Sequence, residues 1–216
     1  MSKVIIIGAH GKVALLTVPR LVAAGHEVTG VIRRPEQSDD VRRAGAEAVV
    51  ADVEALSTDE IAEVLAGRDA VVWSAGAGGG SPGRTYAVDR DAAIRTIDAA
   101  EQANASQLVM VSYFGAGPDH GVDPSSDFFA YAESKTEADA HLAASSLGWT
   151  ILRPSRLTEE AGTGGIEAGA GVTGGQVARA TVADVITAVV GAPEAARGLT
   201  LEFNDGDQSI GDVIAG

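Results

Sequence analysis

The sequence predicts an α/β fold, a doubly wound parallel sheet with helices on both faces, forming three layers in a single domain. Short apolar segments alternate with longer segments of helical periodicity, which indicates βαβ units with right-handed crossovers. The first apolar segment, Val4–Ile7, is entirely β-branched and aliphatic, as expected for a strand covered on both faces. A chain of 216 residues is long enough for one hydrophobic core and short for two.

A glycine turn follows this strand in the pattern Gly8-x-x-Gly11-x-x-Ala14 and opens a helix predicted from Lys12 to Ala24. Gly8 ends the strand, Gly11 lets the backbone approach a phosphate, and Ala14 permits close helix packing. Free N–H groups at such a helix start attract a pyrophosphate, although the same pattern also occurs in ordinary strand-to-helix turns. His10 either touches the ligand or is solvated in the loop. We predict that a dinucleotide contacts Gly8, His10, Gly11, Lys12 and Val13.

A second strand, predicted over 26–32, ends in Arg33 and Arg34. In a parallel sheet of this kind the second strand ends beside the ribose of the adenosine. A guanidinium there pairs with a 2′-phosphate through charge-assisted bonds, whereas an acidic residue would bind a free 2′-hydroxyl. The two arginines predict NADP(H) as the preferred cofactor, with NAD(H) as a second option. The alternative is that both are solvated loop charges.

The third and fourth strands, predicted over 47–51 and 69–74, both end in candidate cofactor contacts. Asp52 and Val53 follow the third strand, near the expected adenine edge. Asp52 either accepts a hydrogen bond from the adenine amino group or caps the helix predicted over 57–66. The fourth strand leads into a glycine-rich run over 75–80, which either opens its backbone to the ligand at Ala75, Gly76 and Ala77 or is a flexible linker.

Two later segments carry candidate catalytic side chains. After a helix predicted over 84–104, the fifth strand, 107–112, ends in Ser112. A helix predicted over 125–147 then contains Tyr131 and Lys135. Their i, i+4 spacing places the ammonium near the phenol, where it favours phenolate and lowers the tyrosine pKa. Taken alone, this pair is also common on ordinary helix surfaces.

The last third of the chain is predicted to form the part of the protein that faces the substrate. A sixth strand over 149–152 ends in Arg153 and Pro154. The segment 155–176 is rich in glycine, and its part from Leu157 to Gln176 is predicted to be too flexible for a regular element and to form a lid. Residues 177–216 are predicted to form a small substrate-side region, with a helix over 181–190, a strand over 199–203 and a short tail.

Composition and charge exclude several classes of protein. Lys and Arg number 16 against 30 Asp and Glu, a net charge of −14, and no basic stripe is available for a nucleic-acid backbone. The sequence has no apolar run long enough for a membrane span, no visible signal peptide and no cysteine, so we expect a cytoplasmic protein without disulfides. The four histidines do not form a metal set. The expected partner is a small-molecule substrate.

The order of these motifs resembles the short-chain dehydrogenase/reductase superfamily, whose members have a Rossmann-like fold. More narrowly, it is similar to the atypical branch with NmrA-like and biliverdin-IX-beta-reductase-like members, often labelled NAD-dependent epimerase/dehydratase. Residues 134–154 resemble that branch most strongly. The resemblance implies that Tyr131 is the acid/base, that Ser112 holds the substrate oxygen and that Lys135 binds the nicotinamide ribose. It also implies cofactor contacts at Arg153 and Pro154.

Two departures bear on this assignment. The superfamily often places an asparagine in the helix after the fourth strand, and Asp89 is its nearest counterpart here. Tyr113, beside Ser112, is a rival for the site of Tyr131. We expect an NADP(H)-binding oxidoreductase that transfers hydride between its cofactor and a small carbonyl or quinone-like substrate. The alternatives are a non-catalytic NADP(H) sensor of the NmrA-like type and an NAD(P)-dependent epimerase/dehydratase.

Overall fold

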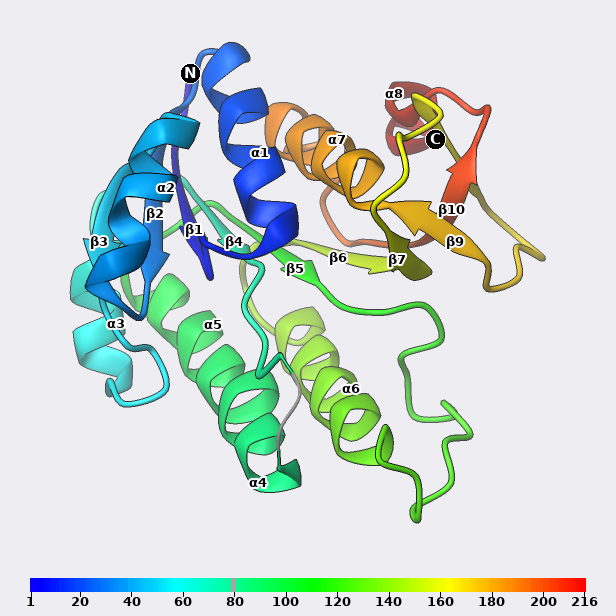
Figure 1. The fold of residues 1–216 in the computed structure, drawn as a ribbon, viewed down its shortest axis with the longest axis horizontal. Coiled ribbons are helices and arrows are strands. Elements are labelled where there is room, and N and C mark those ends of the chain that lie inside the picture. The colour runs from blue at the N-terminus through cyan, green and yellow to red at the C-terminus, as the bar shows by residue number, and fades with distance from the viewer. Residues whose placement is uncertain (79–80) are drawn as a thin grey trace.

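The computed structural model describes residues 1–78 and 81–216; Gly79 and Gly80, the end of the expected glycine run, lie outside the described residues. An eight-stranded sheet in the order β3-β2-β1-β4-β5-β6-β10-β8 forms its centre (Figure 1). This order confirms the predicted doubly wound sheet. The sheet is not wholly parallel, because β8 runs antiparallel to β10. Its strands are β1 Lys3–Ile7, β2 Glu27–Ile32, β3 Glu47–Val50, β4 Ala70–Trp73, β5 Gln107–Val111, β6 Gly148–Pro154, β8 Gly165–Ala168 and β10 Leu199–Gly206.

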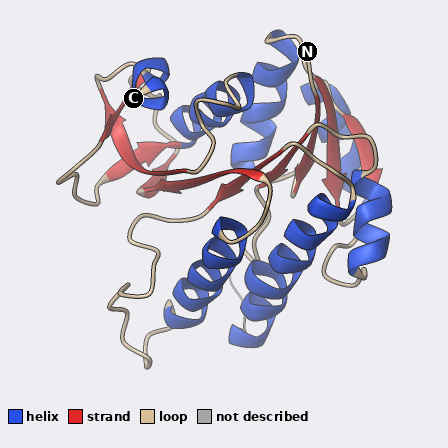
Figure 2. Ribbon diagram, turned by 180° about the vertical axis from the view of Figure 1, so that it is seen from behind, coloured by secondary structure: helices blue, strands red, loops and turns tan. Residues whose placement is uncertain are grey.

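Helices cover both faces of the sheet, which gives the predicted three layers (Figures 1 and 2). One face carries α1 Lys12–Ala23, α2 Ser38–Ala44, α7 Arg179–Gly191 and α8 Ile210–Ala215. The other carries α3 Thr58–Leu65, α5 Ala93–Gln102 and α6 Phe129–Ala143. Short helical segments are η1 Pro35–Gln37, α4 Pro82–Thr85 and the π-helix η2 Tyr86–Ala92, which leads into α5.

Because successive side chains of a strand point to opposite faces of the sheet, the hydrophobic core has two parts. Val4 and Ile6 of β1 pack with α1 and α7, whereas Ile5 and Ile7 point to the opposite face, toward α3 and α5. All four side chains are at most 1% exposed. Burying each contributes roughly 1.5–3 kcal/mol, which is why the apolar run in β1 defines the centre of the fold.

The prediction of a flexible, element-free segment over 157–176 is wrong. β7 Arg156–Thr158 and β9 Gln176–Ala178 pair as a small parallel sheet, and β8 forms the edge of the main sheet. A Cβ on Gly165 would lie 2.6 Å from the carbonyl oxygen of Gln208, so this glycine permits close strand approach. Glycine is also common in flexible loops, but Gly165 instead allows two segments of backbone to pack closely.

Several boundaries also differ from prediction. Sequence analysis missed η1 and α2, and the expected short tail contains α8. The expected helix over 125–147 begins later, at Phe129, and ends at Ala143. Ser57, not Asp52, caps α3, because its hydroxyl accepts a hydrogen bond from the Glu60 N–H. Within residues 1–78 and 81–216, no helix is both long and apolar enough to cross a membrane.

Candidate functional site

Three adjoining hollows lie along the carboxyl ends of the parallel strands, beside the switch in strand order between β1 and β4. Ligands of doubly wound folds bind at such a switch point. The first hollow, of about 290 Å³, is lined by Arg33 and Asp52, among others. The second, of about 570 Å³, is lined by Lys135, among others. The third, of about 550 Å³, contains Tyr113. Shared lining residues join them: Gly11 and Ser74–Ala77 border the first and second, and Ser112, Phe128, Tyr131 and Leu157 border the second and third.

The glycine turn brings β1, α1 and the loop after β4 into contact. Gly8 has a φ of +83°, and a Cβ there would lie 2.7 Å from the Cα of Ala75. Gly11 is the N-cap of α1, and no side chain caps this helix start. Its first N–H groups are therefore available to an anion. Lys12 and Val13 line the second hollow, beside this helix start.

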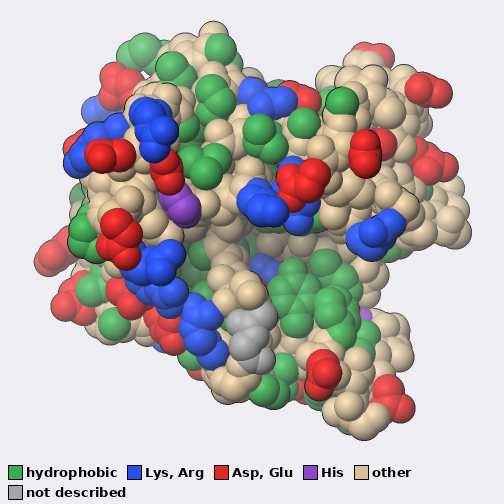
Figure 3. All heavy atoms as spheres, in the orientation of Figure 1, with side chains coloured by type: hydrophobic (Ala, Val, Ile, Leu, Met, Phe, Trp, Pro, Cys, Tyr) green, Lys and Arg blue, Asp and Glu red, His purple; other side chains and the backbone are tan. Residues whose placement is uncertain are grey.

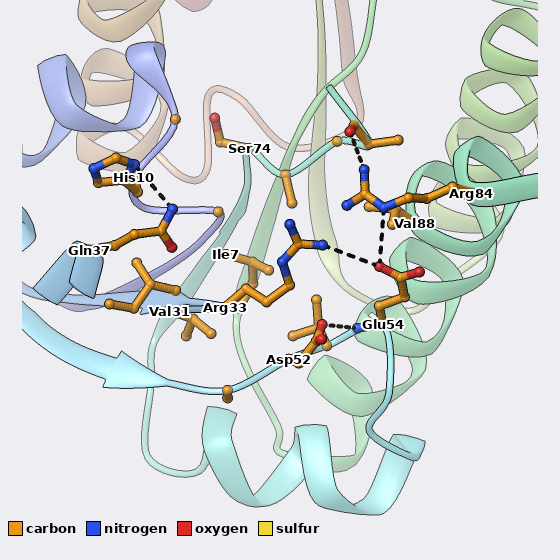
Figure 4. A pocket seen from close by; sticks show the side chains of 18 residues that line it. Ile7, His10, Val31, Arg33, Gln37, Asp52, Glu54, Ser74, Arg84 and Val88 are labelled. Carbon is orange, nitrogen blue, oxygen red and sulfur yellow. Dashed lines mark hydrogen bonds and ion pairs between the residues drawn. The ribbon is translucent and has the colours of Figure 1, made fainter. Parts of the chain in front are cut away.

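Arginines from two distant segments meet in the first hollow. Glu54 Oε2 lies 3.7 Å from Arg33 Nη1 and 3.8 Å from Arg84 Nε (Figure 4). Arg84 also donates a hydrogen bond to the Ala77 carbonyl. Arg34 does not line this hollow; its side chain is exposed and lies 3.8 Å from Glu36. Of the two expected arginines, the structure brings only Arg33 to the site, and it adds Arg84.

His10 is held in the first hollow by two side chains. Its Nε2 lies 2.7 Å from Asp40 Oδ2. Its Nδ1 lies 3.3 Å from the Gln37 amide, as Figure 4 shows. The hydrogen bond from His10 lowers the pKa of Asp40; desolvation opposes this effect, and the nearby Arg43 lowers the pKa further. His10 is thus fixed by hydrogen bonds while 34% of its side chain stays exposed, and its contact with a ligand stays a prediction. Asp52 and Val53 line the same hollow, as expected for residues beside adenine.

Lys135 and Asp89 form a buried pair at the second hollow. Lys135 Nζ donates to the Val111 carbonyl at 3.1 Å and lies 3.5 Å from Asp89 Oδ1. The exposed fractions are 2% for Lys135 and 1% for Asp89, so both charges are desolvated and depend on each other. Asp89 Oδ2 also accepts a hydrogen bond from the Ala77 N–H at 2.9 Å. One carboxylate thus ties the loop after β4 to the lysine on α6.

Tyr131 lies at the junction of the second and third hollows. Lys135 Nζ is 5.7 Å from the centroid of its ring, so the two residues do lie together on α6. Burial raises the pKa of Tyr131, and Lys135 opposes that rise while Asp89 and Asp139 add to it. Lys135 lowers the pKa of the phenol, as its spacing predicts, but desolvation outweighs this effect and the pKa is raised overall.

Ser112 is engaged by a carboxylate that sequence analysis did not predict for the site. Its Oγ donates to Asp139 Oδ2 at 2.9 Å, and Arg153 Nε donates to the same oxygen at 3.1 Å. Burial raises the pKa of Asp139, although Arg153 and Ser112 oppose that rise. Arg153 also lies 3.7 Å from Glu202 and lines none of the three hollows. The structure therefore does not bring Arg153 to the cofactor side, and the Ser112 proton points at Asp139.

Aromatic rings line the third hollow. The Tyr113 ring lies 5.2 Å from that of Phe128 and 5.5 Å from that of Tyr131, between centroids. Pro154 and Leu157 complete an apolar lining. Tyr113 does not reach the second hollow, and desolvation raises the pKa of its phenol. As a rival acid/base it is therefore farther from the expected nicotinamide site than Tyr131 is.

Comparison with known proteins identifies the family. Residues 8–193 match the family described as NAD(P)H-binding. The chain belongs to this NAD(P)H-binding family. The match confirms the expected Rossmann-like NAD(P)-binding domain and a nicotinamide cofactor.

Proteins of similar sequence carry epimerase or oxidoreductase names. A Bacillus subtilis protein named an uncharacterized sugar epimerase is 33% identical, over 98% of this chain and 98% of its own. The structure of a Bacillus halodurans protein, provisionally named an NAD-dependent epimerase/dehydratase, is 33% identical with a TM-score of 0.90 and covers 99% of each chain. The structure of an oxidoreductase from Lactococcus lactis is 27% identical with a TM-score of 0.84, over 98% of this chain and 94% of its own.

The residues of this NAD(P)H-binding protein fit a dinucleotide that extends from the first hollow into the second. The uncapped start of α1 suits the pyrophosphate, and Arg33 and Asp52 suit the adenosine end. Lys135 and the loop at Ala77 would border the nicotinamide end. Within the described ranges 1–78 and 81–216, no group of three His, Asp or Glu side chains could hold a metal ion.

Sequence analysis missed several residues that the fold brings to the site. Arg84 and Asp139 stand in the sequence without a local motif, and only the packing of distant helices shows their roles. Asp89 stands where the superfamily often has an asparagine, but the sequence did not predict its contact with Lys135, which depends on the π-helix that carries Asp89. Other missed residues in or beside the hollows include Gln37, Glu54, Ser74, Phe128, Arg156 and Arg179.

Proposed function

We propose that this protein is an NADP(H)-dependent oxidoreductase that transfers hydride between its cofactor and a small carbonyl or quinone-like substrate, with Tyr131 as the acid/base. The position of Tyr131 carries the proposal. It borders both the hollow that suits the nicotinamide and the aromatic hollow beyond it. A group placed there can exchange a proton with a substrate that lies against the nicotinamide.

The chemistry requires one hydride and one proton. When bound, NADPH supplies a hydride from C4 of its nicotinamide to the carbonyl carbon, and NADP⁺ is left. Tyr131 gives its proton to the carbonyl oxygen, so the product is an alcohol. Because burial raises its pKa, the phenol is protonated at neutral pH and serves as the acid in this direction. The nearby Lys135 stabilises the phenolate that remains.

The first hollow supports the preference for NADP(H). Arg33 and Arg84 share one carboxylate, Glu54, at distances above those of a good hydrogen bond. A 2′-phosphate carries more negative charge than Glu54 and would offer the guanidinium groups closer, charge-assisted bonds. NAD(H), which lacks this phosphate, would leave the arginines with Glu54 alone.

Turnover of NADPH with a panel of aldehydes, quinones and flavins, run beside a binding titration, tests the proposal. Tyr131→Phe keeps the ring, so we expect unchanged NADPH affinity and a fall in turnover of about 10²- to 10⁴-fold. Tyr113→Phe is the matched control and should keep turnover within a few-fold. Lys135→Ala should reduce cofactor affinity and turnover together. Near-full turnover by Tyr131→Phe would contradict the role of Tyr131, and binding without any turnover would favour the NmrA-like sensor.

A second candidate, epimerase/dehydratase chemistry, is favoured by the names of the relatives at 33% identity. The lining of the third hollow speaks against a sugar, whose hydroxyls need many polar partners, because Tyr113, Phe128 and Leu157 are largely apolar. Solvent-isotope incorporation into nucleotide sugars without net oxidation of cofactor would identify this activity. We expect none.

A further inference from the structure

The third hollow combines an aromatic wall with one unpaired cation. Tyr113, Phe128 and Tyr131 form a cluster with centroid distances of 5.2–5.5 Å. Phe128 is 45% exposed, although an apolar ring of this size is favourable to bury. Figure 3 shows the molecule hollowed on this side, with hydrophobic side chains below the hollow and Lys or Arg side chains above it. A flat, apolar ligand would cover the ring that is now open to solvent.

Arg156 supplies the cation. It is the first residue of β7, lines the third hollow and is exposed. Its side chain forms no ion pair or hydrogen bond within residues 1–78 and 81–216, although acidic residues are in large excess in this chain. By contrast, Lys12 and Arg179, near the second hollow, share Glu159 at 2.7 Å and 3.0 Å. Arg156 is therefore the guanidinium at the third hollow that remains available for an anion from outside.

The small sheet holds Arg156 at a fixed place. β7 pairs with β9 from Arg156↔Gln176 to Thr158↔Ala178, and the Arg156 N–H donates to the Gly175 carbonyl at 3.3 Å. On the other side of the same loop, Gly174 faces the Phe114 ring, since a Cβ there would lie 3.4 Å from Phe114 Cδ1. Arg156 thus stands on a paired strand, and the segment before β9 packs against Phe114, the neighbour of Tyr113 in the aromatic wall.

We infer that the substrate is a flat, conjugated carbonyl compound that carries an anionic group, with its ring against Phe128 and its anion, such as a carboxylate, on Arg156. The inference rests on the proposed function, because it assigns the third hollow to the hydride acceptor. A guanidinium and a carboxylate form paired charge-assisted hydrogen bonds, which a neutral amide or ester cannot match. In the reaction the acceptor carbon gains hydride from NADPH and its oxygen gains the Tyr131 proton, while the anionic group is unchanged.

Binding of two matched, non-reducible probes to the NADP⁺-loaded protein tests recognition apart from chemistry. We expect 2-naphthoate to bind at least about tenfold more tightly than 2-naphthamide, as measured by probe fluorescence. Arg156→Gln should abolish this difference, and Arg156→Lys should keep part of it. Phe128→Ala should weaken both probes by a similar factor. Arg197→Gln, an exposed arginine outside the three hollows, is the control and should bind as the unmutated protein does.

Turnover of a second matched pair separates this inference from the proposed function. With NADPH, 4-formylbenzoate should have a KM about tenfold or more below that of its methyl ester, and Arg156→Gln should remove the advantage. Equal KM values, or equal affinities for the two naphthalene probes, would overturn the inference while leaving the oxidoreductase proposal standing. An Arg156-dependent preference for 2-naphthoate with no turnover of any acceptor would support the binding site and overturn the oxidoreductase.

Discussion

At the scale of single residues, Arg33 and Arg34 show how one step along the chain separates two roles. Successive side chains of an extended segment point to opposite sides. Arg33 therefore turns into the first hollow, where Glu54 and Arg84 meet it, whereas Arg34 turns to solvent near Glu36. The sequence predicts that a cation stands at this strand end. It does not predict which of two adjacent cations faces the ligand, because that depends on where β2 leaves the sheet.

Arg33→Ala should change cofactor preference. Losing one charge-assisted contact with the 2′-phosphate should cost about 1.5–3 kcal/mol, so NADPH should bind roughly tenfold or more weakly while NADH barely changes. Nicotinamide fluorescence titrations of both cofactors provide the measurement. Arg34→Ala is the adjacent control and should keep the NADPH affinity. Equal affinities of the unmutated protein for NADPH and NADH would contradict the preference.

The buried carboxylate of Asp139 should give stability a specific pH dependence. Burial raises its pKa in the folded state above the usual 3.8, so between these two pKa values the folded chain binds more protons than the unfolded chain. Its contribution to the free energy of unfolding should therefore fall as pH rises through this window, by about 1.4 kcal/mol for each unit of pKa difference.

Urea unfolding from pH 4 to 8 measures this dependence. Relative to the unmutated protein, Asp139→Asn should lack the decline, because the amide does not titrate. Asp207→Asn, which removes an exposed carboxylate, should retain it. Parallel pH profiles for the unmutated protein and Asp139→Asn would show that Asp139 has no raised pKa.

At the scale of elements, the sequence predicts those strands and helices that depend only on neighbouring residues. The run Val4–Ile7 and the glycine turn after it are local, and both were predicted correctly. Tyr131 and Lys135 were also placed correctly on one helix, since their spacing is helical. The strand β8 could not be predicted in this way. Its one glycine, Gly165, is needed because β10 and the chain at Gln208 lie close by, and these partners are distant in sequence.

Gly165→Ala should destabilise the edge of the main sheet. Its Cβ would meet backbone oxygens of Gln208 at 2.6 Å and Gly206 at 3.0 Å, which cannot move without separating strands. We expect a loss of about 1–3 kcal/mol in urea unfolding and faster amide exchange at Ile166. Gly211→Ala in α8 is the control, since its Cβ has room and alanine favours helix. Unchanged stability of Gly165→Ala would indicate that β8 is a loosely held lid.

At the scale of the whole molecule, the site is assembled from both halves of the chain. The first half supplies the turn at Gly8 and the cations of the first hollow, and the second half supplies Tyr131 and Lys135 on α6. The parallel strands of the sheet bring them together, because these strands end at one edge. The fold class alone predicts that these residues of the two halves lie close together. It could not predict contacts such as Ser112 with Asp139, which depend on how α6 packs beside β5 and β6.

A single domain with a ligand site across both halves should unfold as one unit and respond to cofactor as one unit. At about 100 times its Kd, NADPH should stabilise the fold by about 2.7 kcal/mol. For a chain of this size that raises Tm by about 5–10 °C. Differential scanning calorimetry should show one transition that moves as a whole. Arg33→Ala, if it weakens NADPH binding about tenfold, should lose about half of the shift at the same NADPH concentration while keeping the shift with NADH. Two transitions, of which NADPH moves only one, would show that the halves fold separately and that the site belongs to one of them.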